Sequence, residues 1–175
     1  LFRSPYGGQI LNMSVSETTM LTAILAVGGL IGFSWASRVL SKGTDPFYMA
    51  SMGALIGIPA FVLIVLSAPL ALKTLFLVGT FLIGFGGGLF SHGTLTATMQ
   101  FAPANQRGLA LGAWGAVQAT AAGIAIGLGG VIRDIVVALG ASHWLPEGLI
   151  EPTTGYSVVY FLEIGLLIAT IRSEE

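Results

Sequence analysis

Residues 108–132 read GLALGAWGAVQATAAGIAIGLGGVI, a run of 25 residues between Arg107 and Arg133 without a charged side chain. A bilayer core about 30 Å thick requires about 20 apolar residues of helix, so this run predicts a membrane-spanning helix. Small residues recur along it and fall within roughly a third of the helix circumference: they are Gly108, Gly112, Gly115, Ala119, Gly123, Gly127 and Gly130. This face is predicted to allow close packing of another helix.

The composition extends this prediction to the whole chain. Of the 175 residues, 54% are hydrophobic and 9% are charged, and the mean hydropathy is +0.88, whereas soluble domains carry about 25% charged residues. The formal net charge is −1 and the Lys and Arg residues are scattered singly, which argues against nucleic-acid binding. The chain contains no cysteine, so disulfides and thiolate sites are excluded. Because it does not begin with Met, we expect a segment of a longer protein.

Charge-free runs divide the chain into five predicted membrane helices within a single membrane domain, residues 1–175. Helix is the expected form because backbone groups in lipid need internal partners. The first helix begins at a capping-box pattern, Ser14 to Glu17, and the second at Asp45 and Pro46, an N-cap and a first-turn proline. The predicted spans are approximately 15–40, 47–67, 73–100, 108–139 and 156–171. The predicted fold class is therefore an all-α polytopic membrane protein.

The distribution of Lys and Arg predicts the orientation of these spans. Four of these residues fall on one side of the membrane and three on the other: Arg38, Lys42, Arg107 and Arg172 against Arg3, Lys73 and Arg133. By the positive-inside rule, the turns at 38–45 and 101–107 are expected in the cytoplasm.

A glycine-rich run, Gly84-Phe85-Gly86-Gly87-Gly88, lies inside the third predicted span. It is not a dinucleotide fingerprint, because no strand precedes it. It could be a locally loosened helix that lines a cavity, as in transporters. The interpretation that we adopt is close helix packing through Gly84 and Gly88, because the same four-residue spacing recurs elsewhere in the chain.

His92 is the histidine that falls inside a predicted span, where an ionisable side chain suggests function. Its imidazole could bind the magnesium of a chlorin or hydrogen-bond a substrate. We adopt the alternative of a neutral histidine satisfied by Ser91, Thr94 or a backbone carbonyl of a neighbouring helix. At about 1.5 Å per residue, His92, Trp114 and Gln118 lie at similar depths in successive antiparallel spans, so the three could meet at one level.

Glu163 lies near the middle of the last predicted span and would be costly there as an anion facing lipid. It could couple proton movement to transport. The interpretation that we adopt is an interhelical hydrogen bond, or a side chain that reaches the membrane surface along a tilted helix. Arg133 and Asp134 are expected to form a structural pair near a helix end.

The sequence contains no arrangement typical of an enzyme. There is no set of Ser, His and Asp at a defined turn, and no group of His and carboxylates at metal-ligand spacing. We therefore expect neither catalysis nor a protein-bound metal site, with His92 as a chlorin magnesium ligand the one exception considered.

Several long strings of this sequence resemble the C-terminal half of the PucC/LhaA family. They are residues 4–9 (SPYGGQ), 14–19 (SVSETT), 88–99 (GLFSHGTLTATM), 108–123 (GLALGAWGAVQATAAG) and 129–134 (GGVIRD). The resemblance covers nearly all of the chain. It implies a fold like that of the major facilitator superfamily, with twelve helices in two halves. Residues 1–11 would then be the tail of the seventh helix, followed by about five complete membrane helices.

The resemblance also implies a function. Proteins of this family are associated with assembly of bacterial light-harvesting complexes and are proposed to handle bacteriochlorophyll. The expected partners are antenna α and β polypeptides, the LH1 ring or reaction centre, and membrane lipids. The expected cofactors are bacteriochlorophyll and carotenoid, and the expected location is the bacterial inner, intracytoplasmic photosynthetic membrane. Two alternatives are a proton-coupled transporter of a small solute or tetrapyrrole, and a structural subunit of an antenna ring.

Two modes of contact are available to an assembly factor of this kind. An antenna helix could approach the small-residue face at Gly112, Gly115 and Ala119. Alternatively, a chlorin or carotenoid could lie against aromatic side chains. The candidates for contact with pigment or a partner protein are His92, Trp114, Gln118, Phe81, Phe85, Phe90, Gly112, Gly115 and Ala119, and Glu163 is the candidate for proton coupling or an interhelical polar contact.

Overall fold

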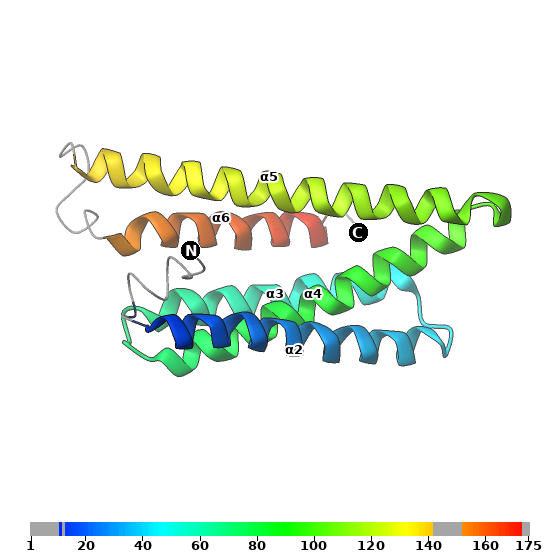
Figure 1. The fold of residues 1–175 in the computed structure, drawn as a ribbon, viewed down its shortest axis with the longest axis horizontal. Coiled ribbons are helices and arrows are strands. Elements are labelled where there is room, and N and C mark those ends of the chain that lie inside the picture. Colours follow the sequence, from blue (N-terminus) through cyan, green and yellow to red (C-terminus); the bar gives the residue numbers. More distant parts are fainter. Residues whose placement is uncertain (1–10, 12, 142–151, 173–175) are drawn as a thin grey trace.

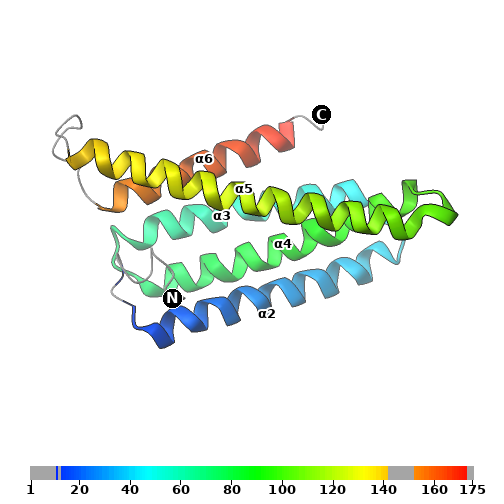
Figure 2. The same cartoon turned by 45° about the horizontal axis from the view of Figure 1, so that its top comes forward.

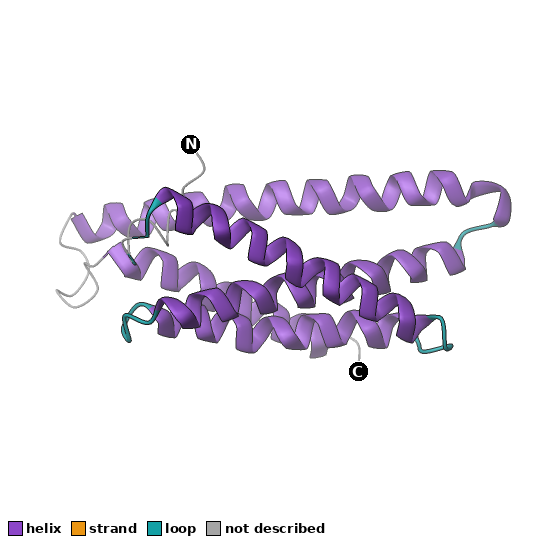
Figure 3. Ribbon diagram, turned by 60° about the horizontal axis from the view of Figure 1, so that its bottom comes forward, coloured by secondary structure: helices purple, strands orange, loops and turns teal. Residues whose placement is uncertain are grey.

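A computed structural model of the chain describes residues 11, 13–141 and 152–172, and within these residues every regular element is a helix and none is a strand (Figure 3). The elements are α2 (Val15–Leu40), α3 (Pro46–Ser67), α4 (Lys73–Phe101), the short 3₁₀ helix η1 (Ala104–Gln106), α5 (Arg107–Ala141) and α6 (Pro152–Arg172). The predicted all-α fold class is confirmed.

Four of the described helices are long and apolar enough to cross a membrane: α2, α3, α4 and the segment Ala104–Leu139 that includes most of α5. Helix α6 has 21 residues but a shorter apolar run, Thr154–Ala169. That α6 completes a fifth crossing stays a prediction. The chain is thus an integral membrane protein by the length and apolar character of its helices.

The helices run alternately in opposite directions along the long axis of the molecule (Figure 1). Helix α4 packs between α2 and α3, and α6 packs against both α3 and α5. Helix α5 contacts α4 mainly where the two are joined and then diverges from it, so one flank of α5 lies at the surface of the bundle (Figure 2).

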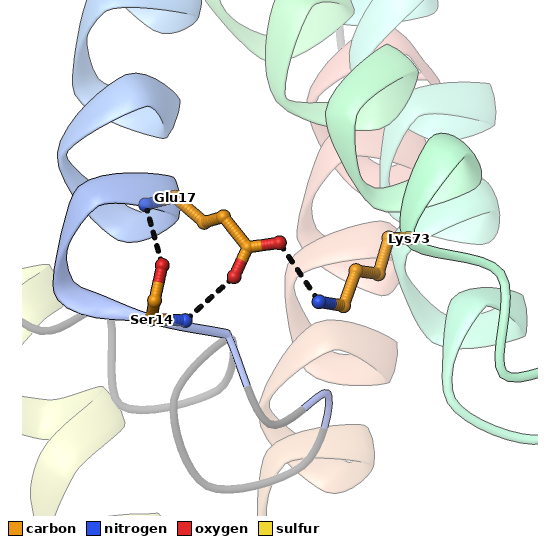
Figure 4. A network of polar contacts seen from close by, with 3 residues as sticks. All are labelled: Ser14, Glu17 and Lys73. Carbon is orange, nitrogen blue, oxygen red and sulfur yellow. Dashed lines mark hydrogen bonds and ion pairs between the residues drawn. The ribbon is translucent and has the colours of Figure 1, made fainter.

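Local signals in the sequence position the first two helices. At the start of α2 the backbone N–H of Ser14 donates to Glu17 Oε2 (2.7 Å), and the Glu17 N–H donates to Ser14 Oγ (3.2 Å). This is the predicted capping box, and it satisfies backbone amides that have no helical partner. Lys73 Nζ also donates to Glu17 Oε1 (2.8 Å), which ties the start of α4 to the start of α2 (Figure 4).

The second helix begins as predicted at an Asp-Pro pair. The Asp45 carboxylate accepts hydrogen bonds from the backbone N–H groups of Phe47 (2.7 Å) and Tyr48 (3.4 Å). Pro46 occupies the first turn, where its missing N–H costs no hydrogen bond. Gly43 in the preceding turn has φ +90°, a left-handed conformation that glycine adopts without a steric penalty.

Glycines allow α4 to lie in backbone contact with α2. A Cβ built on Gly28 or Gly32 of α2 would collide with the carbonyl oxygens of Phe81 and Phe85. On the other side of the seam, a Cβ on Gly88 would lie 2.7 Å from the Phe33 backbone nitrogen, closer than side chains tolerate. The predicted packing role of the α4 glycines is therefore confirmed, and the alternative of a loosened helix is wrong because α4 is continuous.

The opposite side of α4 packs against α3 in the same way. A Cβ on Gly53 would lie 2.5 Å from the Gly86 carbonyl oxygen, and a Cβ on Gly93 would lie 2.7 Å from the Pro46 carbonyl oxygen. Because lipid supplies no hydrophobic drive between helices, such close contact provides the dispersion energy that holds them together.

Candidate functional site

The small-residue face of α5, defined here by Gly112, Gly115 and Ala119 with the glycines on either side of them, is open. Within the described residues, a Cβ on Gly108, Gly112, Gly115, Gly123, Gly127 or Gly130 would meet no atom within 4 Å. None of residues 107–139 of α5 is buried. The prediction that this face packs closely on another helix therefore has no counterpart inside the described chain, although the same spacing is packed in α2 and α4. No helix among the described residues covers this face.

His92 lies at the seam between α4 and α2. The Phe33 ring stands edge-on to the imidazole, with ring centroids 4.2 Å apart and an interplanar angle of 83°. Its Nδ1 is buried and has no hydrogen-bond partner among the described residues. The expectation that Ser91, Thr94 or a backbone carbonyl satisfies the imidazole is therefore wrong for Nδ1 in the described structure.

His92 does not fit axial ligation of a chlorin through Nδ1, because a buried ring nitrogen leaves no room for a macrocycle. Within the described parts of the chain, no three His or acidic side chains come together in a group that could hold a metal ion.

Trp114 of α5 contacts a different side of α4 from the side on which His92 lies. The indole Nε1–H donates to Thr94 Oγ1 (3.2 Å). Thr94 is two residues beyond His92, which is about 200° around a helix. The prediction that His92, Trp114 and Gln118 meet is therefore wrong in its geometry. His92 packs on Phe33 of α2, whereas Trp114 of α5 reaches Thr94 on another flank of α4, and half-buried Gln118 makes no hydrogen bond to either in the described structure.

The candidate aromatic residues do not form one surface. Phe81 and Phe85 stack on each other (centroids 6.4 Å apart, planes at 11°), and Phe85 also stacks on Trp35 of α2 (5.7 Å, 20°). Phe90 lies on the side of α4 that faces α3 and α6, and Trp114 of α5 contacts Thr94 on another side of α4. Sequence reasoning did not single out Trp35; its position one turn before Arg38, near a membrane surface, was the available signal.

Within the described residues, two hollows lie against α4. The α2/α4 groove has a volume of about 610 Å³ and is lined by Leu30, Ile31, Ser34, Trp35, Arg38 and Phe85. The α3/α4/α6 pocket has a volume of about 210 Å³ and is lined almost wholly by apolar atoms, from Gly53, Ala54, Gly57, Phe61, Ile83, Gly86, Gly87, Phe90 and Leu167. Pockets for whole drug-sized ligands are typically 300–1,000 Å³, so the smaller one can take a hydrocarbon tail but not a macrocycle.

Glu163 lies on the inner side of α6. Tyr160 of the same helix contacts α3 through Phe61 (ring centroids 5.9 Å), and Val159 lies 3.5 Å from a Cβ built on Gly129 of α5. Glu163 Oε2 is buried without a hydrogen-bond partner among the described residues. The prediction of an interhelical hydrogen bond is therefore wrong for this oxygen.

Arg133 joins α5 to α6. Its guanidinium donates to Asp134 Oδ1 from Nε (2.9 Å) and to the Tyr156 hydroxyl from Nη1 (3.0 Å), and it lies 5.4 Å from the centre of the Tyr156 ring. The predicted pair of Arg133 and Asp134 is confirmed, and its structural role includes the link to α6.

The four long apolar helices among the described residues define the chain as a polytopic α-helical membrane protein. The family model described as PUCC protein matches residues 2–173. The chain belongs to the PucC family.

Curated relatives agree with this assignment. The chain is 64% identical over 132 residues to a Protein PucC of Rhodovulum sulfidophilum, a match that covers 75% of this chain and 29% of the relative. It is 54% identical over 167 residues to a Protein PucC of Cereibacter sphaeroides, covering 95% of this chain and 35% of the relative. It is also 46% identical to an uncharacterized protein in the puhA-bchM intergenic region of Rhodobacter capsulatus, with the same coverage. The chain thus spans about a third of the length of these relatives, and no solved structure matches it.

Proposed function

We propose that this chain is part of an assembly factor for bacterial light-harvesting complexes, which guides antenna α and β polypeptides into the ring in the photosynthetic inner membrane. Membership of the PucC family supports the light-harvesting context. The observation that carries the mechanism is the open small-residue face of α5. Glycine and alanine let a partner's backbone approach closely, which gives van der Waals contact without polar anchors. Weak, anchor-free contact suits a factor that must release its client to the growing ring.

Pigment delivery is the second element of the proposal. The α3/α4/α6 pocket can hold a hydrocarbon tail of bacteriochlorophyll or carotenoid against Phe61 and Phe90, with the ring system outside it. Gly87 lines this pocket, and a Cβ added there would meet no atom within 4 Å. The substitution Gly87→Leu should therefore fill the pocket while leaving the fold intact, and it should lower bound pigment.

Purification tests this proposal directly. The full-length protein would be extracted mildly from phototrophically grown cells, its absorption spectrum recorded, and its bound polypeptides identified by mass spectrometry. Bacteriochlorophyll together with antenna chains supports the assembly role. A colourless protein without antenna chains contradicts it. Stoichiometric retention in mature rings would instead indicate a structural subunit.

A proton-coupled transporter is the second candidate, and the buried, unpartnered Oε2 of Glu163 favours it. Its test is solute or tetrapyrrole uptake into proteoliposomes driven by a pH gradient. Uptake that is lost in Glu163→Gln would assign the proton to this carboxyl group.

A further inference from the structure

The α2/α4 groove combines an apolar wall with a single cation at one end. Leu30, Ile31 and Phe85 supply the wall, Ser34 supplies a hydroxyl, and Arg38 lies in the last turn of α2. Trp35 is stacked on Phe85, so the aromatic part of the wall is held in place by its own packing. The volume of about 610 Å³ can take a polar headgroup and one hydrocarbon chain, the part of a larger amphipathic molecule that would lie against the protein.

These groups are ordered along the helix axis as a phospholipid is ordered across a leaflet. At about 1.5 Å per residue, Trp35 lies about 4.5 Å deeper than Arg38, and Leu30 and Ile31 lie about 10–12 Å deeper. From the membrane surface inward, the groove thus presents a cation, an interfacial indole and aliphatic side chains. This order corresponds to the headgroup, glycerol region and acyl chain of a phospholipid.

Charge decides which lipid the groove suits. Within the described residues, the ion pairs are Lys73 with Glu17 and Arg133 with Asp134, so Arg38 has no acidic partner. The nearby Asp45 is engaged with backbone amides at the start of α3. Lys42 follows Arg38 by four residues, is also exposed and also lacks an acidic partner in the described structure. A guanidinium can bind a phosphate through two parallel hydrogen bonds.

We propose that the α2/α4 groove is a binding site for an anionic phospholipid, whose phosphate pairs with Arg38 and whose acyl chain lies along Leu30 and Ile31. An apolar protein helix in the groove would leave the guanidinium unpaired. Lys42 adds attraction for the negative charge of the cytoplasmic leaflet, on which the positive-inside rule places this end of α2. The site is independent of the assembly role.

Lipid analysis of the full-length protein tests the site. The protein would be extracted with its surrounding lipid in polymer nanodiscs, washed into mild detergent, and its retained phospholipids quantified by mass spectrometry. Arg38→Gln should lower retained phosphatidylglycerol and cardiolipin several-fold and leave phosphatidylethanolamine unchanged. Arg107→Gln is the matched control, an exposed cation on the same predicted side of the membrane but outside the groove.

A second variant distinguishes lipid binding in the groove from general attraction of anionic lipid to positive charge. It also provides the test if Arg38→Gln does not fold. Ser34→Trp fills the groove and keeps the cation, and it should cause the same several-fold loss. Unchanged anionic lipid in both variants overturns the proposal. So does an equal loss in Arg107→Gln, or a loss of phosphatidylethanolamine in place of the anionic lipids.

Discussion

The indole Nε1 of Trp114 donates a hydrogen bond of 3.2 Å to Thr94 Oγ1, and so links α5 to α4 within the membrane. Hydrogen bonds between membrane helices contribute about 0.6 kcal/mol on average. We predict that Trp114→Phe lowers the free energy of unfolding by about this amount beyond any packing loss. A double-mutant cycle with Thr94→Val, measured by denaturation in mixed micelles, should give a coupling of the same size. Additive effects of the two substitutions would show that the bond does not stabilise the protein.

The seam between α2 and α4 should be intolerant of a single methyl group. Gly88→Ala places a Cβ 2.7 Å from the Phe33 backbone nitrogen, so the helices must separate, at a cost of about 1–3 kcal/mol. The neighbouring Gly87→Ala is the matched control, because its Cβ enters open space and alanine favours helix. Thermal unfolding of the two variants should diverge. Equal melting temperatures would contradict the backbone contact.

The capping box predicts a local effect at the start of α2. Ser14→Ala removes the hydroxyl that accepts from the Glu17 N–H, at a cost of about 1 kcal/mol. Amide hydrogen exchange in the first turn should therefore become about fivefold faster. Ser16→Ala, which changes an exposed serine two residues after the cap, serves as the control and should leave exchange unchanged. Equal exchange in Ser14→Ala and the native protein would be inconsistent with the cap.

The carboxyl group of Glu163 should not contribute to stability. Because Oε2 is buried without a partner in the described structure, replacing the side chain by an apolar one removes a desolvation cost. Glu163→Leu is expected to raise the free energy of unfolding by about 1–3 kcal/mol, with Glu163→Gln between it and the native protein. A decrease in the melting temperature of Glu163→Leu would mean that the carboxyl group has a partner in the full-length protein.

The sequence predicts the helices well because the signals for them are local. The capping box at Ser14 and the Asp45–Pro46 start involve neighbouring residues, and both appear in the structure as expected. Close packing at Gly84 and Gly88 was predicted from their four-residue spacing, and in the structure neither glycine leaves room for a Cβ against α2.

The side to which each polar residue points was less predictable. Depth in the membrane follows from counting residues, but rotation about the helix axis depends on which helices are neighbours. This is why His92 and Trp114 match in level and yet lie on different flanks of α4. The same uncertainty affects glycine spacing: Gly88 is packed and Gly112 is open, although both stand in the same four-residue pattern.

In the proposed assembly role, an antenna helix docks on the open face of α5. The most direct test changes Gly112, Gly115 and Ala119 together to Leu in the full-length protein and measures co-purifying antenna polypeptides. Gly165→Leu on α6 is the control, because a Cβ there also meets no atom within 4 Å. We predict that the triple variant folds, loses the antenna chains and retains its melting temperature, while the control keeps them. Unchanged co-purification in the triple variant would show that antenna helices do not dock on this face.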